Sequence, residues 1–311
     1  MMCKETKMNR VAIFAHYDKK NIIDDYVIFY INELQKIAET VIFVSCCDLQ
    51  ESELNKLNCY KIAKKHCEYD FGSYKIGFNF AKDNKLLKDC KEVVFANDSC
   101  YGPFKPLDKI FEKMSKKSCD FWGLTKNYIG FKKLKNNKVK NIYCPHIQSY
   151  FIVLKSNVFS SKVFENFINS VKYQKYKNDI ILKYEIGLTK TLEKAGFKSD
   201  FAIKDFCKFN NPPVCKWRNL YEKSDFPFVK CSVLRLRNYL HTTIVGWQEL
   251  FTGEQIKLIQ KNLKYTARMK PLRKNAPRFL KEWIMEVIPK GTSIQAVLTR
   301  KLLEIFPIFI D

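Results

Sequence analysis

The sequence predicts an α/β protein whose sheet begins with a Rossmann-like strand–helix–strand unit. An apolar run over residues 10–15 is of strand type, and a second such run covers residues 40–45. Between them, over residues 26–34, apolar positions recur at helical spacing after two acidic residues, which the helix dipole favours at an N-terminus. A strand, a helix and a strand within about 35 residues are typical of a parallel sheet.

The composition indicates a globular protein with room for one large or two ordinary domains. The chain has 311 residues, of which 46% are hydrophobic and 14% aromatic, so it can bury a sizeable core. Its 12 cysteines lack regular spacing and include no CxxC pair, and with only 4 histidines a structural zinc site is not expected. Neither a signal peptide nor a run of about 20 apolar residues is found. We therefore expect reduced thiols and a protein that stays inside the cell.

Strands and helices continue to alternate along the chain. A third strand is expected over residues 59–63, and a buried strand over residues 93–96. The remaining expected elements are a helix over 106–114, a strand over 120–125, a mobile lysine- and asparagine-rich excursion over 126–140, a strand over 146–154, helices over 159–171 and 180–192, and a last strand over 199–203.

The end of the strand over residues 93–96 is the first candidate for a functional site. This run stops abruptly at Asn97-Asp98-Ser99. The carboxyl ends of parallel strands are where α/β proteins bind ligands, because loops vary there while the sheet holds them. Asp98 is therefore a candidate for site chemistry. The alternative is an Asx-turn, in which Asn97 or Asp98 bonds its own backbone.

A second candidate is the stretch over residues 69–81, which we expect to be a glycine turn that leads into an amphipathic helix. A helix N-terminus that opens with glycine and serine offers free backbone N–H groups to a phosphate or a ribose. Asp70, Ser73 and Lys75 are therefore candidates for nucleotide binding. The GxGxxG spacing is absent, and structural capping is the alternative explanation.

The charge of the chain favours anionic partners. Its 55 basic and 32 acidic residues give a net charge of +23, which suits nucleic acid, anionic lipid or phosphorylated small molecules. Basic and apolar residues interleave at helical spacing over residues 252–311, which is compatible with a membrane-surface helix or with a solvated helix that covers the core. No helix-turn-helix or RNP-type motif occurs, so nucleic acid is not the expected partner, although a basic nucleic-acid-binding protein remains an alternative.

Three groups of motifs occur in a fixed order along the chain. The first is NDSCYGPF from Asn97 followed by DFWGLT from Asp120, the second is HIQSYF from His146 followed by YEIGLT from Tyr184, and the third is FPFVK from Phe226 with the leucine and arginine that follow. In order and spacing, from about residue 11 to residue 237, these motifs resemble the rhamnan synthesis protein F family of bacterial polysaccharide glycosyltransferases. The basic tail lies outside the resemblance.

This resemblance implies a glycosyltransferase-A-like fold, a Rossmann-type mixed sheet flanked by helices. The transferase domain would cover residues 1–240, and a basic helical extension that could associate with the membrane would cover residues 241–311. The implied activity is transfer of a deoxyhexose, with rhamnose expected, from a dTDP or GDP donor to a lipid-linked or glycan acceptor in O-antigen, capsule or rhamnan synthesis. The implied location is the cytoplasm, peripheral on the inner face of the bacterial membrane. A non-catalytic scaffold of a polysaccharide assembly complex is the other alternative.

The resemblance also implies roles at the donor diphosphate. In this fold the acidic motif at the strand end normally has two carboxylates that hold Mg²⁺ or Mn²⁺. Here the triplet Asn97-Asp98-Ser99 has one, so Asp98 is the implied metal ligand. Since hard divalent ions want several oxygen ligands, Lys230 and Arg235 are candidates to neutralise the diphosphate in place of a metal.

Inversion at the anomeric carbon requires a general base for the acceptor hydroxyl. The resemblance implies Glu185, expected at a helix start, with Asp120 as the second candidate; a helix N-terminal acid that faces the dipole is the structural alternative for Glu185. His146 and Gln148 open a strand beside the expected site and are candidates for binding sugar hydroxyls. A partly buried, satisfied histidine is the alternative for His146.

Overall fold

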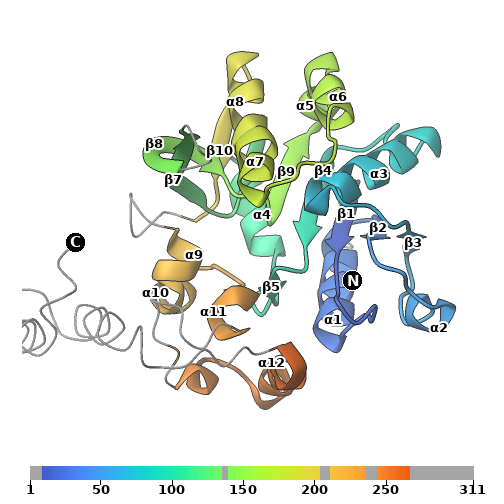
Figure 1. Cartoon of the computed structure of the whole chain (residues 1–311), viewed down its shortest axis with the longest axis vertical. Helices are drawn as coiled ribbons and strands as arrows, with labels where there is room; N and C mark the ends of the chain where they lie inside the picture. The colour runs from blue at the N-terminus through green and yellow to red at the C-terminus, as the bar shows by residue number, and fades with distance from the viewer. Residues whose placement is uncertain (1–8, 135–138, 204–210, 236–243, 245, 267–311) are drawn as a thin grey trace, which may run out of the picture.

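The computed structural model describes residues 9–134, 139–203, 211–235, 244 and 246–266, which form helices around a mixed sheet (Figure 1). The sheet has seven strands in the order β10-β6-β9-β4-β1-β2-β3. Only β9 runs antiparallel to its neighbours β4 and β6, and the other pairs are parallel. The α/β class and the mixed sheet are therefore confirmed. The strands are β1 (Arg10–His16), β2 (Thr40–Ser45), β3 (Tyr60–Ala63), β4 (Glu92–Asn97), β6 (Phe121–Gly123), β9 (Phe151–Lys155) and β10 (Ser199–Phe201).

Helices cover both faces of the sheet because its strands are apolar on both sides. Along β1, Ala12 and Phe14 belong to one buried cluster, and Val11 and Ile13 belong to the other, as the two-residue period of a strand requires. The first cluster includes residues of α1 (Asp25–Ile37), α4 (Asp108–Ser115), α10 (Trp217–Lys223), α11 (Cys231–Arg235) and α12 (Gly253–Thr266). The second includes residues of α3 (Tyr69–Asp83), α5 (Ser156–Phe159), α6 (Lys162–Asn169), α7 (Lys177–Ile180) and α8 (Ile186–Lys194).

Smaller elements complete the described part of the chain. Two short antiparallel pairs lie outside the main sheet: β5 with β11, and β7 with β8. Their bounds and those of the remaining helices are β5 (Cys100–Tyr101), β7 (Lys126–Lys133), β8 (Val139–Ile147), β11 (Val229–Lys230), α2 (Glu51–Leu54), α9 (Pro212–Cys215), a π-helix (Ile181–Glu185) and a 3₁₀-helix (Trp247–Leu250).

Two predictions around residues 126–154 were wrong. Residues 126–133 are not a mobile excursion, because they form β7, which pairs with β8. The lysine-rich composition hides the packing of this hairpin: a Cβ added at Gly130 would lie 2.7 Å from Cys144 Cβ and 3.1 Å from Ile186 Cδ1, so its inner side lies against α8. The strand expected over residues 146–154 is split into the end of β8 and the whole of β9, with a turn at residues 148–150 between them. Residues 135–138 lie outside the described part.

The expected glycine turn before α3 was also wrong. The helix begins at Tyr69, so Gly72 and Ser73 lie inside it, and both are buried. A Cβ at Gly72 would lie 2.5 Å from Glu68 Cβ and 2.7 Å from the ring of His66. Glycine is therefore required here by the close approach of the preceding loop and not by a turn. The consequence is that α3 offers no glycine-opened N-terminus to a ligand.

Helix α12 packs on α1 and is joined to the body by a buried polar side chain. Asn262 is fully buried, donates from Nδ2 to Asp24 Oδ2 over 2.8 Å, and accepts at Oδ1 from Tyr101 over 2.6 Å and from Arg235 Nε over 3.1 Å. The predicted boundary after residue 240 and the basic tail beyond residue 266 lie outside the described residues and stay predictions. Among the helices that the structure describes, none has the length and apolarity to span a membrane.

The Asn262 contacts predict that α12 contributes substantially to stability. We expect Asn262→Leu to lower the free energy of unfolding by about 3 kcal/mol, because it leaves the buried groups of Asp24, Tyr101 and Arg235 without their shared partner. Urea unfolding followed by circular dichroism measures this change. The matched control is Lys261→Ala, which removes an exposed ion pair to Asp25 on the same helix and should change stability little. Equal midpoints for wild type and Asn262→Leu would contradict the assignment.

Candidate functional site

The candidate site lies at the edge of the sheet where β1 and β4 end. The pairing of Ala15 with Asn97 places the two strand ends side by side. Because β9 is antiparallel, the pairing of Ala96 with Phe151 brings the residues before β9 to the same edge. This edge therefore collects side chains from the turns after β1 and β4 and from residues 148–150. It is also where open α/β sheets bind ligands.

The side chains of the triplet Asn97-Asp98-Ser99 have different partners. Those of Asn97 and Ser99 bond each other, and that of Asp98 bonds the chain after β1. Asn97 Nδ2 donates to Asp70 Oδ2 over 3.1 Å, and Asn97 Oδ1 accepts from the backbone N–H and the hydroxyl of Ser99 over 3.1 and 2.5 Å. Asn97 is thus the residue that makes the Asx-turn. The carboxylate of Asp98 instead accepts the backbone N–H of Tyr17 over 2.7 Å, and burial raises the pKa of Asp98.

Lys230 reaches this edge through the pairing of β5 with β11. Lys230 lies opposite Cys100, and its ammonium donates to Ser99 Oγ over 3.0 Å and lies 3.9 Å from the centroid of the Tyr150 ring. Gly102 permits this approach: its φ is +112°, and a Cβ there would lie 2.7 Å from the carbonyl oxygen of Pro227. The structure therefore brings the predicted Lys230 together with the predicted Asn97 and Ser99.

Glu185 comes to the site from the other side, at the end of the π-helix. Its Oε2 accepts from Ser149 Oγ over 2.8 Å, and its Oε1 lies 3.6 Å from His146 Nε2. The expected helix start at Glu185 was wrong, because helical structure runs from Lys177 to Lys194 without a break. Attraction to a helix N-terminus therefore does not explain why an acidic residue stands at position 185. Single π-helical turns are frequent at functional sites.

His146 is a partner of Glu185 and does not present a free edge to solvent. The ring is 1% exposed, and Nδ1 lies 2.7 Å from the carbonyl oxygen of Cys144. A carbonyl only accepts, so Nδ1 carries a proton and donates. Nε2 then faces the Glu185 carboxylate and has no hydrogen-bond partner within the described part of the chain.

Asp70 and Glu185 form a pair of interacting carboxyl groups. Burial raises the pKa of Asp70 to about 6, helped by the nearby charge of Glu185 and opposed by Ser149 and Lys230. Burial would also raise the pKa of Glu185, but the nearby His146 ring, with help from the Ser149 hydroxyl and the charge of Lys230, lowers it below its ordinary value. Neighbouring carboxyl groups with diverging proton affinities are typical of acid–base sites. Glu185 is the ionised member, and Asp70 is the more readily protonated one.

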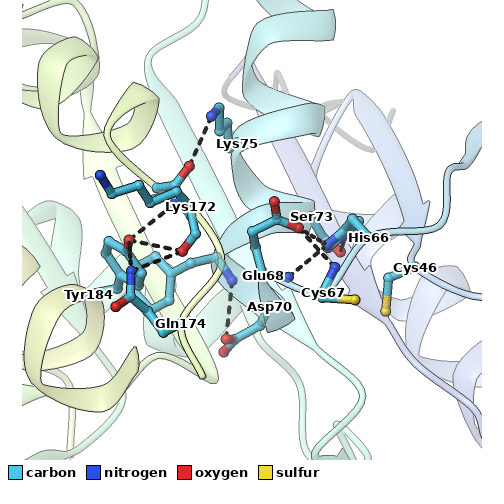
Figure 2. A network of polar contacts seen from close by, with 12 residues as sticks. Cys46, His66, Cys67, Glu68, Asp70, Ser73, Lys75, Lys172, Gln174 and Tyr184 are labelled. Atoms are coloured by element: carbon cyan, nitrogen blue, oxygen red, sulfur yellow. Dashed lines mark hydrogen bonds and ion pairs between the residues drawn. The ribbon is translucent and has the colours of Figure 1, made fainter. Parts of the chain in front are cut away.

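Ser73 and Lys75, the other two residues of α3 predicted to bind nucleotide, do not point toward the site as Asp70 does. Ser73 is buried, with its hydroxyl 3.0 Å from His66 Nε2, and the ammonium of Lys75 donates to the carbonyl oxygen of Val171 over 2.9 Å. Figure 2 shows Asp70, Ser73 and Lys75 directed toward different neighbours of α3. Of this group, the structure brings only Asp70 to the site.

Gln148 and Arg235 lie near the site, but other residues of the protein bind their polar atoms. Gln148 is 5% exposed, accepts from Thr125 Oγ1 over 2.8 Å and donates to Asn211 Oδ1 over 3.1 Å. The guanidinium of Arg235 donates to the side chains of Tyr26, Tyr101 and Asn262. These contacts indicate that Gln148 and Arg235 hold neighbouring side chains of the protein together.

Asp120, the second candidate base, lies at the opposite edge of the sheet. It directly precedes β6, whose first residue pairs with Leu154 near the far end of β9. One carboxylate oxygen accepts from Asn157 over 2.6 Å, and the other accepts from the backbone N–H of Lys198 over 2.7 Å. The second of these bonds lowers the pKa of Asp120, which makes it a weaker base. The structure does not bring Asp120 together with the carboxyl pair.

The donor set around Asp98 does not by itself form a metal centre. A divalent ion such as Mg²⁺ or Mn²⁺ wants several oxygen ligands, and one oxygen of Asp98 already accepts from Tyr17. In the part of the chain that the structure describes, no group of three or more His, Cys, Asp or Glu could hold a metal ion. Metal binding at Asp98 stays a prediction.

Sequence reasoning missed Ser149 and Tyr150. Ser149 bonds Glu185, and the Tyr150 ring lies under the ammonium of Lys230. The run His146-Ile147-Gln148-Ser149 puts three polar residues inside an otherwise apolar stretch. This run was the available sign that the chain turns here before entering β9.

Comparison with protein families and curated proteins identifies relatives. The family model described as RgpF, rhamnan synthesis protein F, matches residues 41–298. The expectation that the basic tail lies outside the resemblance was therefore wrong, because the match continues through most of that tail. The chain is 26% identical over 222 residues to the uncharacterized protein y4gN of Sinorhizobium fredii, with 70% of this chain and 54% of the relative covered. It is also 26% identical over 219 residues to the virulence protein VirA of Vibrio anguillarum, with 60% and 66% covered. The chain thus spans about half to two thirds of the length of these relatives.

Solved structures share the arrangement of the sheet only loosely. One 4-diphosphocytidyl-2C-methyl-D-erythritol synthase superimposes with a TM-score of 0.41 at 7% identity, over 66% of this chain and 94% of that one. The synthase of the same name from Anaerococcus prevotii gives a TM-score of 0.39 at 10% identity, over 66% and 93%. Structural similarity this low supports no conclusion about activity.

The proximity of the two carboxyl groups predicts that the titration of Asp70 depends on the charge of Glu185. We expect Asp70 to titrate at about pH 6 in the wild type and at a lower pH in Glu185→Gln, because that change removes a neighbouring negative charge. Carboxyl ¹³C NMR over a pH series measures both values. The matched control is Glu193→Gln, on the exposed side of α8, which should leave the titration of Asp70 unchanged. If Asp70 titrates identically in Glu185→Gln and wild type, the two groups do not interact.

Proposed function

This chain belongs to the rhamnan synthesis protein F family, and we propose that it is a nucleotide-sugar-dependent glycosyltransferase of bacterial cell-surface polysaccharide synthesis. The observation that carries the proposal is the meeting of an ionised, half-buried Glu185 and the ammonium of Lys230 at the carboxyl edge of the sheet. The donor is a dTDP- or GDP-linked deoxyhexose, with rhamnose as the sugar. The acceptor is a lipid-linked or glycan hydroxyl.

The proposed reaction is a single displacement with inversion. The acceptor oxygen forms a bond to the anomeric carbon, the bond from that carbon to the diphosphate oxygen breaks, and the nucleoside diphosphate leaves with the electron pair. Glu185 accepts the proton of the acceptor hydroxyl. His146 and Ser149 favour the ionised form of Glu185 before the reaction, so this carboxylate begins as a competent base.

Lys230 is the proposed group that neutralises the leaving diphosphate. Negative charge builds on the diphosphate as the bond breaks, and an ammonium fixed nearby stabilises it more in the transition state than in the ground state. The ring of Tyr150 and the hydroxyl of Ser99 hold the ammonium in place. In this proposal Asp70, Asn97 and Ser99 bind the donor through the hydrogen-bonded chain that begins at Lys230.

Two further features belong to the proposal. The protein works in the cytoplasm at the inner face of the membrane, where its lipid-linked acceptor lies, and the basic residues beyond position 266 attract it to anionic lipid. The alternative of a non-catalytic scaffold is supported by the single carboxylate of the triplet over residues 97–99. A scaffold would bind nucleotide or glycan without turnover.

The two candidate bases can be compared directly. We expect Glu185→Gln to lower kcat by a factor of about 100 to 10,000, because general base catalysis is lost, while nucleotide binding persists. Asp120→Asn, at the far edge of the sheet, should keep kcat within a factor of about three. Mass spectrometry of the product formed on a lipid-linked acceptor, after donor screening, gives both rates. Unchanged turnover in Glu185→Gln would contradict the assignment of the base.

The role of Lys230 predicts a loss of nucleotide affinity. Lys230→Met should weaken binding of the preferred nucleoside diphosphate about tenfold, because one charge-assisted contact is lost. Isothermal titration with dTDP, GDP and UDP measures this affinity. Lys223→Met, which removes an exposed lysine of α10, is the matched control and should bind as the wild type does. A wild-type protein that binds none of the three nucleotides would overturn the proposed function.

A further inference from the structure

A short segment between α6 and α7 contacts both elements that carry the carboxyl pair. We call residues 171–174 the strap. On one side, the ammonium of Lys75 in α3 donates to the carbonyl oxygen of Val171 over 2.9 Å. On the other side, the hydroxyl of Tyr184 in the π-helix accepts from the backbone N–H of Lys172 over 3.0 Å and donates to the carbonyl oxygen of the same residue over 3.1 Å. Figure 2 shows these contacts on either side of the strap.

Two side chains of the strap, Val171 and Gln174, are buried, while Lys172 and Tyr173 are exposed. Val171, Gln174 and Tyr184 are all less than a tenth exposed. Gln174 Nε2 donates to the Tyr184 hydroxyl over 3.1 Å and to the carbonyl oxygen of Lys172 over 3.2 Å, and Gln174 Oε1 accepts from Lys183 over 2.6 Å. Buried hydrogen bonds of this kind permit few alternative arrangements, because each broken one leaves an unsatisfied polar group.

Each anchored residue lies close in sequence to a carboxyl group. Lys75 follows Asp70 by five positions on α3, and Tyr184 directly precedes Glu185. The Tyr184 ring also packs 5.8 Å from the ring of Phe71, the residue after Asp70. A displacement of either element relative to the strap therefore changes the separation of the two carboxyl groups.

We infer that the strap sets the spacing between Asp70 and Glu185, with Lys75 and Tyr184 as the positioning residues that tie α3 and the π-helix to it. Two like charges repel, so without the strap they would separate. This spacing is a structural property of the chain, and its effect on turnover rests on the proposed function. The sequence had suggested Lys75 as a nucleotide ligand, and its contact with Val171 gives it a different role.

The test measures the titration of Asp70 in full-length variants. The groups that face Asp70 are Glu185, Lys230 and Tyr74, and those that face Glu185 are His146, Lys230 and Asp70. Tyr184→Phe keeps the ring and removes the hydroxyl, and Lys75→Met keeps the aliphatic stem and removes the ammonium. We expect each to lower the pH at which Asp70 titrates by about half a unit, roughly a threefold change in proton affinity. Lys75→Arg should restore the wild-type titration.

A matched control separates this effect from a general loosening of the fold. Lys82 also joins α3 to α6, through an exposed ion pair with Glu165 that does not involve the strap. Lys82→Met should therefore leave the titration of Asp70 unchanged. Wild-type titration of Asp70 in both Tyr184→Phe and Lys75→Met, with lowered thermal stability, would overturn the inference and leave the strap a purely structural feature. If either Tyr184→Phe or Lys75→Met does not fold, the titration of Asp70 in the other variant tests the inference.

Turnover provides the second readout. We expect Tyr184→Phe to lower kcat about tenfold and to change KM for the donor less than threefold, because misplacement of the base affects the transition state more than substrate binding. A shifted titration with wild-type kcat would show that the strap spaces the carboxyl groups but that turnover does not need this spacing, which overturns its catalytic relevance. Failure of the wild type to bind nucleotide would overturn the proposed function and leave the titration result standing.

Discussion

Two carboxyl groups of like charge, Asp70 and Glu185, lie within electrostatic reach of each other at the end of a buried sheet, and much of the surrounding structure compensates for this. Burial of an uncompensated charge is costly, so each group requires hydrogen bonds or a countercharge. Ser149 and His146 contact Glu185, while Lys230 provides a positive charge to both groups. The result is asymmetric: the pKa of Glu185 is lowered and that of Asp70 is raised.

The compensating groups come from segments far apart in the chain. Because β9 is antiparallel to its neighbours β4 and β6, the chain that enters β9 lies at the carboxyl end of β4 and places Ser149 there. Lys230 comes from a strand pair outside the main sheet, and the π-helix brings Glu185 from a helix on the face that α3 also covers. Each segment is held by contacts with the apolar clusters, so the geometry of the polar site depends on the packing of the core.

A second polar network supports the site from the other face of the sheet. Arg235 and Asn262 are bonded to each other and to Tyr101, which links α11 and α12 to the turn after β4. The C-terminal helices that the structure describes are therefore part of the body that holds the site. Arg235 had seemed a candidate for diphosphate binding from its residue type alone, and its contacts with neighbouring side chains explain why a buried arginine is needed here.

The sequence by itself determined the α/β class, most of the strands of the main sheet and the strand end at Asn97-Asp98-Ser99, because apolar period and turn residues are local properties. The family motifs also indicated Glu185 and Lys230. Only the tertiary structure decided that Asp70 faces Glu185 while Ser73 does not, and that Asp120 lies at the far edge. The antiparallel direction of β9 and the packing of α3 on the sheet set these positions. Both depend on contacts between residues distant in sequence, which local patterns do not encode.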